Sequence, residues 1–339
     1  MAILSALAIA AVGVAQGHGL PEPDAARMRA DLEFLCSVDL TGRETGTAGA
    51  EKAAAYVAQK MQEAGALPLR VGGFGGVTPY HYPWALPGGA FHAGTAPQGV
   101  ASDVVGLLHG QDARLAAEFV FITAHLDHLG THDGTLYPGA DDDASGTAGL
   151  LEVMRLLREA NPRRSIAFLA ASGEEEGLLG SEAFLAGMPV AIAAIKADIN
   201  LDMIGRGRKG ELHVMPARRE GYVTTLTRDA RSIAGAHSVT LSAGIEPYWE
   251  DSDHYSFARR AIPSICFNTG IHADYHQPSD TPDRIDYAGL TNVVRIVRDL
   301  ALATANADAA PSVLPPSVWR KWAWGPYRSP NLHLVKGAP

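Results

Sequence analysis

Two stretches of apolar residues constrain the fold more than any other feature of the chain. Residues 119–124 and 165–171 carry hydrophobic side chains almost without interruption. A strand with one wet face alternates polar and apolar residues, so continuous runs of this length are typical of strands buried on both faces. We therefore expect a largely parallel sheet covered by helices, with further strands at residues 103–107, 197–204 and 262–268.

Amphipathic helices are predicted between these strands. Residues 47–64, 145–159 and 287–303 place apolar side chains at helical spacing. Strands that alternate with helices predict an α/β fold, with a mostly parallel (mixed) central β-sheet sandwiched by helices. The sequence has no recognisable repeat or interdomain linker, so residues 16–304 are predicted to form one catalytic domain. Residues 305–339, rich in Pro and Trp, form a tail of unknown role.

The N-terminal residues have the composition of an export signal. Residues 2–15 are nearly all apolar, and Gly13-Val14-Ala15 offers the small side chains of a cleavage site. The run is shorter than the ~20 residues that a membrane-spanning helix needs. We therefore predict a signal peptide at residues 1–15, an exported (periplasmic or extracellular) protein and no stable membrane span. A buried first helix is the alternative.

Charge and cysteine content exclude two classes of site. The formal net charge is −9, which argues against a nucleic-acid partner because phosphate binding needs a clustered basic surface. The chain has only two cysteines, Cys36 and Cys266, and no Cys-x-x-Cys pair. A thiolate zinc site is therefore not expected. We interpret both cysteines as unpaired core residues rather than as a disulfide.

Acidic and histidine residues cluster directly after the predicted buried strands. Ligands of open α/β sheets bind at the carboxyl ends of the strands, so these side chains are expected to share one cleft. Buried carboxylates are costly unless a cation compensates them, and imidazole and carboxylate groups are ligands that zinc accepts. The sequence thus predicts a hydrolytic metal site without choosing between Glu174 and Glu175, or between His272 and His276. The other candidates are His125, Asp127, Asp141 and Asp202.

Motifs in this order resemble those of the co-catalytic di-zinc aminopeptidase family, which also contains glutamate carboxypeptidases and glutaminyl cyclases. The likeness covers roughly residues 32–300. The motifs are Gly42-Arg43-Glu44-Thr45-Gly46-Thr47, Ala124-His125-Leu126-Asp127-His128, Gly139-Ala140-Asp141-Asp142-Asp143-Ala144-Ser145-Gly146, Glu174-Glu175, Asn200-Leu201-Asp202-Met203, Ser252-Asp253-His254 and His276 within Asp-Tyr-His-x-Pro-x-Asp-Thr.

The resemblance implies a set of two Zn²⁺ ions per chain and their ligands. Asp141 is expected to bridge both zincs, and an unusual cis peptide is expected after it, at Asp141-Asp142. His125 and Asp202 would complete one metal, and Glu175 and His276 the other. This choice favours His276 over His272.

Three further residues are assigned to catalysis. The resemblance makes Glu174 the general base and acid for a hydroxide that bridges the metals. Asp127 suits the role of orienting His125 through the second ring nitrogen. His254 is a candidate donor to the tetrahedral oxyanion, with a packing histidine as the alternative.

These assignments predict a zinc-dependent exopeptidase that acts on peptides, most simply an aminopeptidase. A carboxypeptidase of the same family is the first alternative, but it should show arginines poised for a C-terminal carboxylate. A glutaminyl cyclase is less favoured because His125 is present as a metal ligand. A non-catalytic homologue is disfavoured because all the ligand types and Glu174 are intact.

Overall fold

The computed structural model describes most of the chain. The described residues are 19–69, 79–87, 99–188, 191–207, 211–322 and 324. The predicted signal peptide at residues 1–15 and the end of the tail lie outside them, so export stays a prediction. No helix in these ranges is both long and apolar enough to span a membrane.

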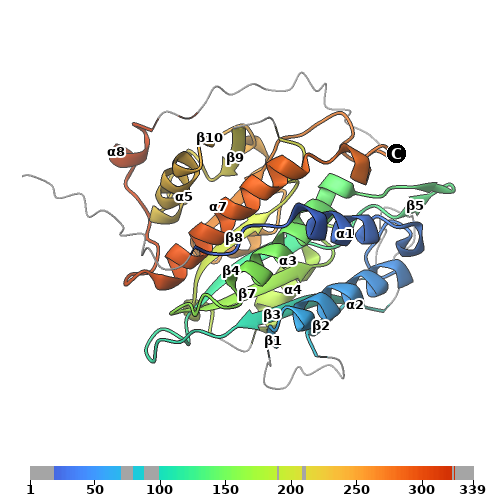
Figure 1. Cartoon of the computed structure of the whole chain (residues 1–339), viewed down its shortest axis with the longest axis horizontal. Helices are drawn as coiled ribbons and strands as arrows, with labels where there is room; N and C mark the ends of the chain where they lie inside the picture. The colour runs from blue at the N-terminus through green and yellow to red at the C-terminus, as the bar shows by residue number, and fades with distance from the viewer. Residues whose placement is uncertain are drawn as a thin grey trace, which may run out of the picture.

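Helices and strands alternate along much of the chain (Figure 1). The helices are α1 (Ala25–Leu35), α2 (Ala48–Glu63), α3 (Gly146–Leu157), α4 (Leu179–Gly187), α5 (Thr225–Ala236), α6 (His254–Ala258), α7 (Tyr287–Asn306) and α8 (Pro316–Trp319). The strands are β1 (Leu67–Pro68), β2 (His81–Ala85), β3 (Val100–Leu108), β4 (Phe119–His125), β5 (Thr131–His132), β6 (Thr135–Leu136), β7 (Ser165–Ala171), β8 (Ile195–Leu201), β9 (Glu211–Met215), β10 (Thr240–Ser242) and β11 (Ser264–Asn268).

Nine of these strands form one mixed sheet. Its order is β1-β3-β7-β4-β8-β11-β9-β10, and β2 pairs with β3. The four central strands β7, β4, β8 and β11 are mutually parallel, whereas β3 and β9 join them antiparallel. The predicted α/β class is confirmed, and the carboxyl ends of the four parallel strands meet at one edge of the sheet.

Each face of the sheet has its own hydrophobic core. Helices α1, α2, α3, α5 and α7 contribute to the larger core, and α4 and α6 to the other. Strand β7 shows why its sequence is apolar throughout, because Phe168 belongs to the larger core and Leu169, the next residue, to the smaller. Successive side chains of a strand point to opposite faces, so a strand buried on both faces needs apolar residues at every position.

Most predicted elements agree with the structure to within a few residues at their ends. The strand predicted at residues 197–204 ends at Leu201, because Met203 adopts a left-handed conformation (φ 54°) and the chain turns away from the sheet. Thr47 caps α2 as expected, accepting a hydrogen bond from the Ala50 amide. Cys36 and Cys266 are both buried and unpaired, which confirms the interpretation of two core thiols.

The described part of the tail packs against α5. The Leu314 amide donates to the Val223 carbonyl just before this helix, and Trp319 is buried. The guanidinium of Arg231, on α5, lies over the ring of Trp322 at 5.4 Å and over that of Trp324 at 4.5 Å. These tryptophans are therefore packing residues in this structure.

Phe121 offers a test of the smaller core. Its ring is fully buried and lies 5.8 Å from that of Phe184 and 5.5 Å from that of Phe257. We predict that Phe121→Ala lowers the free energy of unfolding by about 3–5 kcal/mol, because it leaves a cavity in a packed core. Val38→Ala, at a 74% exposed position, should stay within about 0.5 kcal/mol of wild type in the same urea titration. Equal effects of the two changes would contradict this packing.

Candidate metal centre

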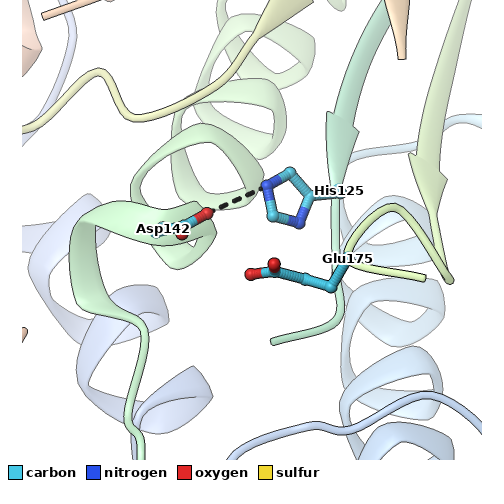
Figure 2. A group of neighbouring side chains, drawn as sticks. All are labelled: His125, Asp142 and Glu175. Carbon is cyan, nitrogen blue, oxygen red and sulfur yellow. Dashed lines mark ion pairs between the residues drawn. The ribbon is translucent and has the colours of Figure 1, made fainter. Parts of the chain in front are cut away.

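His125 stands at the carboxyl end of β4 and is held from several sides. Its backbone N–H donates to Asp143 Oδ2 at 3.2 Å, and its carbonyl accepts from the Thr147 hydroxyl at 2.8 Å. Its ring Nδ1 lies 3.2 Å from the carbonyl oxygen of Asp127. These contacts leave ring Nε2 directed at Asp142, whose Oδ1 is 3.2 Å away (Figure 2).

Asp142 contacts two histidines through its two oxygens. Besides the contact with His125, its Oδ2 lies 3.0 Å from His276 Nε2. The turn that carries it, Ala140–Ser145, precedes α3 and is fixed by Asp280. Asp280 Oδ2 accepts the backbone N–H groups of Asp141 and Asp142 at 2.9 and 3.1 Å. A carboxylate held in this way can bridge two cations.

The structure places the carboxylate of Asp142, rather than that of Asp141, between His125 and His276, whereas the family resemblance implied Asp141 as the bridging residue. Asp141 turns its carboxylate away from His125: Oδ1 accepts the Gly205 N–H at 2.6 Å, and Oδ2 lies 3.1 Å from His272 Nε2. The non-proline cis peptide also lies one residue later than predicted, at Asp142-Asp143. Three consecutive aspartates fit the motif in more than one register, and the backbone contacts of the turn decide which carboxylate faces the histidines.

Glu174 and Glu175 follow β7 and divide between two parts of the centre. Glu175 Oε2 lies 3.1 Å from His276 Nε2, on the same side as Asp142. Glu174 instead directs Oε2 toward His125 Nε2, at 4.0 Å, and its backbone N–H donates to Asp127 Oδ1 at 3.2 Å. The prediction that neighbouring glutamates divide two jobs is consistent with this arrangement.

Asp202 completes the group from the end of β8, and His276 from the loop after β11. Asp202 directly follows β8, and side-chain nitrogen and oxygen atoms of Asp202, His125 and Glu174 lie within 4.8 Å of one another. Atoms of His125, Asp142 and Glu175 form a second such group. Figure 2 shows His125 at a strand end with the carboxylates of Asp142 and Glu175 directed into the space beside its ring.

The electrostatics of this centre call for a cation. Within the described residues, no lysine or arginine forms an ion pair with Asp142, Glu174 or Asp202. Burial raises the pKa of Asp202 to about 7 and that of Glu174 well above its usual range. Burial opposes protonation of His276, but hydrogen bonds to Asp142 and Glu175 outweigh it and raise the pKa of His276 to about 10. Bound metal would replace the protons that these groups otherwise share.

Sequence reasoning missed two neighbours of the proposed ligands. His128 Nδ1 lies 2.8 Å from Glu175 Oε1, so this imidazole supports a carboxylate of the centre. The Tyr275 ring stacks on His276, with centroids 3.8 Å apart. Burial, with the negative charges of Asp142 and Glu175, raises the pKa of the Tyr275 hydroxyl well above its usual value. Both residues lie within quoted motifs, but only the fold reveals the direction of their side chains.

Asp127 and His254 differ in how closely they relate to this centre. Asp127 holds the His125 ring through its backbone carbonyl, while its side chain lies 3.8 Å from ring Nδ1 and supports Glu174. His254 is fully buried against Trp249, with ring centroids 4.8 Å apart. Burial lowers the pKa of His254 to about 3, so its ring is neutral. The ring of His254 is closed to solvent in this structure. Its role as an oxyanion donor stays a prediction.

The fold and the centre agree with a family match over more than half of the chain. Residues 103–301 match the model of Peptidase family M28, and the chain belongs to this family. The aminopeptidase YwaD of Bacillus subtilis is 28% identical over 207 residues, which are 58% of this chain and 43% of that protein. A probable zinc metalloprotease of Pyrenophora teres is 44% identical, with 52% of this chain and 42% of that protein covered. The chain spans about half the length of the curated relatives it matches.

Solved structures share the fold at low sequence identity. A zinc aminopeptidase from Bacillus subtilis superposes with a TM-score of 0.64 and 18% identity, covering 84% of this chain and 95% of that one. A glutaminyl cyclase of Porphyromonas gingivalis also gives a TM-score of 0.64 and 18% identity, with 83% and 98% covered. The fold is thus shared by proteins of different activity, and the function must be argued from the centre.

Two adjacent aspartates test the assignment of the bridging carboxylate. We predict that Asp142→Asn weakens binding of a divalent cation by more than about 100-fold, beyond the 10–100-fold typical of residues that only support a ligand. Asp141→Asn is the matched control, since its carboxylate is occupied by Gly205 and His272, and it should keep near-wild-type stoichiometry. Metal content after dialysis would be measured for both. Loss of metal in Asp141→Asn alone would restore the assignment made from the sequence.

Proposed function

We propose that this chain is a zinc-dependent aminopeptidase that binds two zinc ions and hydrolyses N-terminal residues from peptides. The observation that carries the proposal is the position of Asp142, which contacts His125 through one oxygen and His276 through the other. The proposed ligands are His125 and Asp202 for one ion, Glu175 and His276 for the second, and Asp142 for both.

The donor set fits zinc by its chemistry. It consists of imidazole nitrogens and carboxylate oxygens, which zinc accepts, and includes three carboxylates against the +4 charge of two ions. When bound, zinc acts as a Lewis acid that acidifies water and polarises the scissile carbonyl. Because ligand atoms come from the ends of β4, β7 and β8 and the loop after β11, substrate would approach from the carboxyl edge of the sheet.

Glu174 is the proposed proton carrier. Burial holds the pKa of Glu174 well above its usual range, which makes its carboxylate a stronger acceptor for a proton from water. In the proposed reaction one Glu174 oxygen takes a proton from the attacking water and returns it to the nitrogen of the leaving amine. Asp127 keeps Glu174 in place through the backbone N–H, so the carboxylate stays beside His125.

Tyr275 is a candidate donor to the carbonyl oxygen that becomes negative. Stacking on His276 fixes its ring beside a proposed ligand. The raised pKa keeps its hydroxyl protonated, as a hydrogen-bond donor requires. This position makes Tyr275 a stronger candidate than the closed His254.

The assignment to aminopeptidases draws on the relatives. Several matched proteins are named aminopeptidases, including YwaD and a probable leucine aminopeptidase of Arthroderma otae. A carboxypeptidase should show arginines poised for a C-terminal carboxylate. Within the described residues, Arg206 pairs with Asp274 at 2.7 Å, so this arginine is already engaged by the protein itself.

Glu174→Gln tests the proposed reaction. We predict that it lowers the rate of hydrolysis of amino-acid arylamides by about 10²–10⁴-fold, the usual contribution of a positioned proton carrier. Its zinc content should stay near that of wild type because Glu174 is not a proposed ligand. Glu159→Gln, whose side chain is 86% exposed, is the matched control and should keep full activity.

The substrate panel distinguishes the related activities. Wild type should hydrolyse substrates with a free N-terminal amine and leave their N-acetylated versions intact. Cleavage of C-terminal residues from N-blocked peptides would indicate a carboxypeptidase, and ring closure of an N-terminal glutamine would indicate a cyclase. Undiminished hydrolysis by Glu174→Gln would contradict the mechanism even if zinc is bound.

A further inference from the structure

Arg43 is a fully buried arginine whose charge is held by backbone carbonyls. Its guanidinium donates four hydrogen bonds: Nε to the Leu126 oxygen at 2.9 Å, Nη1 to Leu35 and Pro138, each at 2.7 Å, and Nη2 to Gly139 at 2.9 Å. Among the described residues it forms no ion pair with a carboxylate. Four oriented carbonyl dipoles therefore offset the desolvation free energy of burying this charge.

Three of the four accepting carbonyls belong to the two loops that present His125 and Asp142, and the fourth, that of Leu35, ends α1. Leu126 lies directly after His125, on the loop that leaves β4. Pro138 and Gly139 lead directly into the turn Ala140–Ser145, which carries Asp142. One guanidinium thus ties together two loops whose relative position sets the 3.2 Å contact between His125 Nε2 and Asp142 Oδ1.

The residues around Arg43 fix the same loops by further contacts. The Gly42 carbonyl accepts the Gly130 N–H at 3.0 Å, and a Cβ at Gly42 would overlap the Gly130 backbone. The Thr45 hydroxyl donates to Asp127 Oδ2 at 2.9 Å and lies 3.1 Å from Ser172 Oγ. Ser172 stands between the end of β7 and Glu174 in the chain. We call residues 42–45 the brace, because they join the loops after β4 and β7 and the turn before α3.

We propose that the brace positions the metal ligands, with Arg43 as its main anchor, and so sets the affinity of the chain for zinc. The proposal rests on the proposed function. A planar guanidinium with five donors can hold carbonyls in several directions at once, whereas a lysine ammonium presents three donors at a point. Residues that fix ligand orientation typically contribute 10–100-fold to metal affinity.

Arg43→Lys tests the proposal against a matched control. Arg164 is also buried and also holds carbonyls, those of Thr304 and Ala307, but it precedes the amino end of β7, away from the metal centre. Metal-free wild type, Arg43→Lys and Arg164→Lys would be titrated with zinc in competition with a chromophoric chelator. The temperature would be one at which circular dichroism shows all three folded. We expect about 10–100-fold weaker zinc binding by Arg43→Lys alone.

Thr45 provides a second, milder test should Arg43→Lys fail to fold. Thr45→Val keeps the shape of the side chain and removes the hydroxyl, while Thr45→Ser keeps the hydroxyl. We expect weaker zinc binding by Thr45→Val and affinity close to wild type for Thr45→Ser.

The outcomes separate this proposal from the proposed function. Zinc affinities of Arg43→Lys equal to those of Arg164→Lys, or of Thr45→Val equal to those of Thr45→Ser, would overturn the brace. Failure of the wild type itself to bind zinc would overturn the proposed function together with the brace.

Discussion

The contacts of Asp142 with His125 and His276 are the interaction on which the functional centre depends. The three residues come from the end of β4, the turn before α3 and the loop after β11. No short-range contact brings them together, so the sheet must place β4 and β11 on either side of β8, with their carboxyl ends at one edge. Burial of the apolar strands on both faces fixes their register. This register brings the carboxyl ends of the strands to the edge where the site lies.

The same centre explains an unusual density of buried charge. Carboxylates of Asp142, Glu174, Glu175 and Asp202 surround His125 and His276. Carboxylates so close together repel one another, and burial makes their ionised forms costly. Histidine contacts compensate this charge only in part, and a pair of divalent cations would do so more completely. The buried Arg43 fits the same logic, since it anchors the loops without placing an anion beside them.

The sequence predicted the core of the fold better than its edges. Strands β3, β4, β7 and β11 were foreseen because continuous apolar runs have one simple explanation, burial on both faces. Helix α5 and strands β9 and β10 were not, because these segments mix polar and apolar residues and their burial depends on tertiary neighbours such as the tail. For the site, the residue types and their strand-end positions were predictable.

The direction of individual side chains was not predictable from the sequence. Asp141 and Asp142 are chemically equal in the motif, and only the hydrogen bonds from Gly205 to Asp141 and from the turn to Asp280 separate their roles. His128 and Tyr275 were missed for a related reason. Each belongs to a quoted motif without an assigned role, and only the folded loops bring it against Glu175 or His276.

Anomalous diffraction at the zinc absorption edge, from crystals of the zinc-loaded protein, would locate the bound metal. We expect two zinc peaks per chain with Asp142 between them, one beside His125 and Asp202 and the other beside Glu175 and His276. A single peak, or a peak at the Asp141–His272 pair, would contradict this expectation.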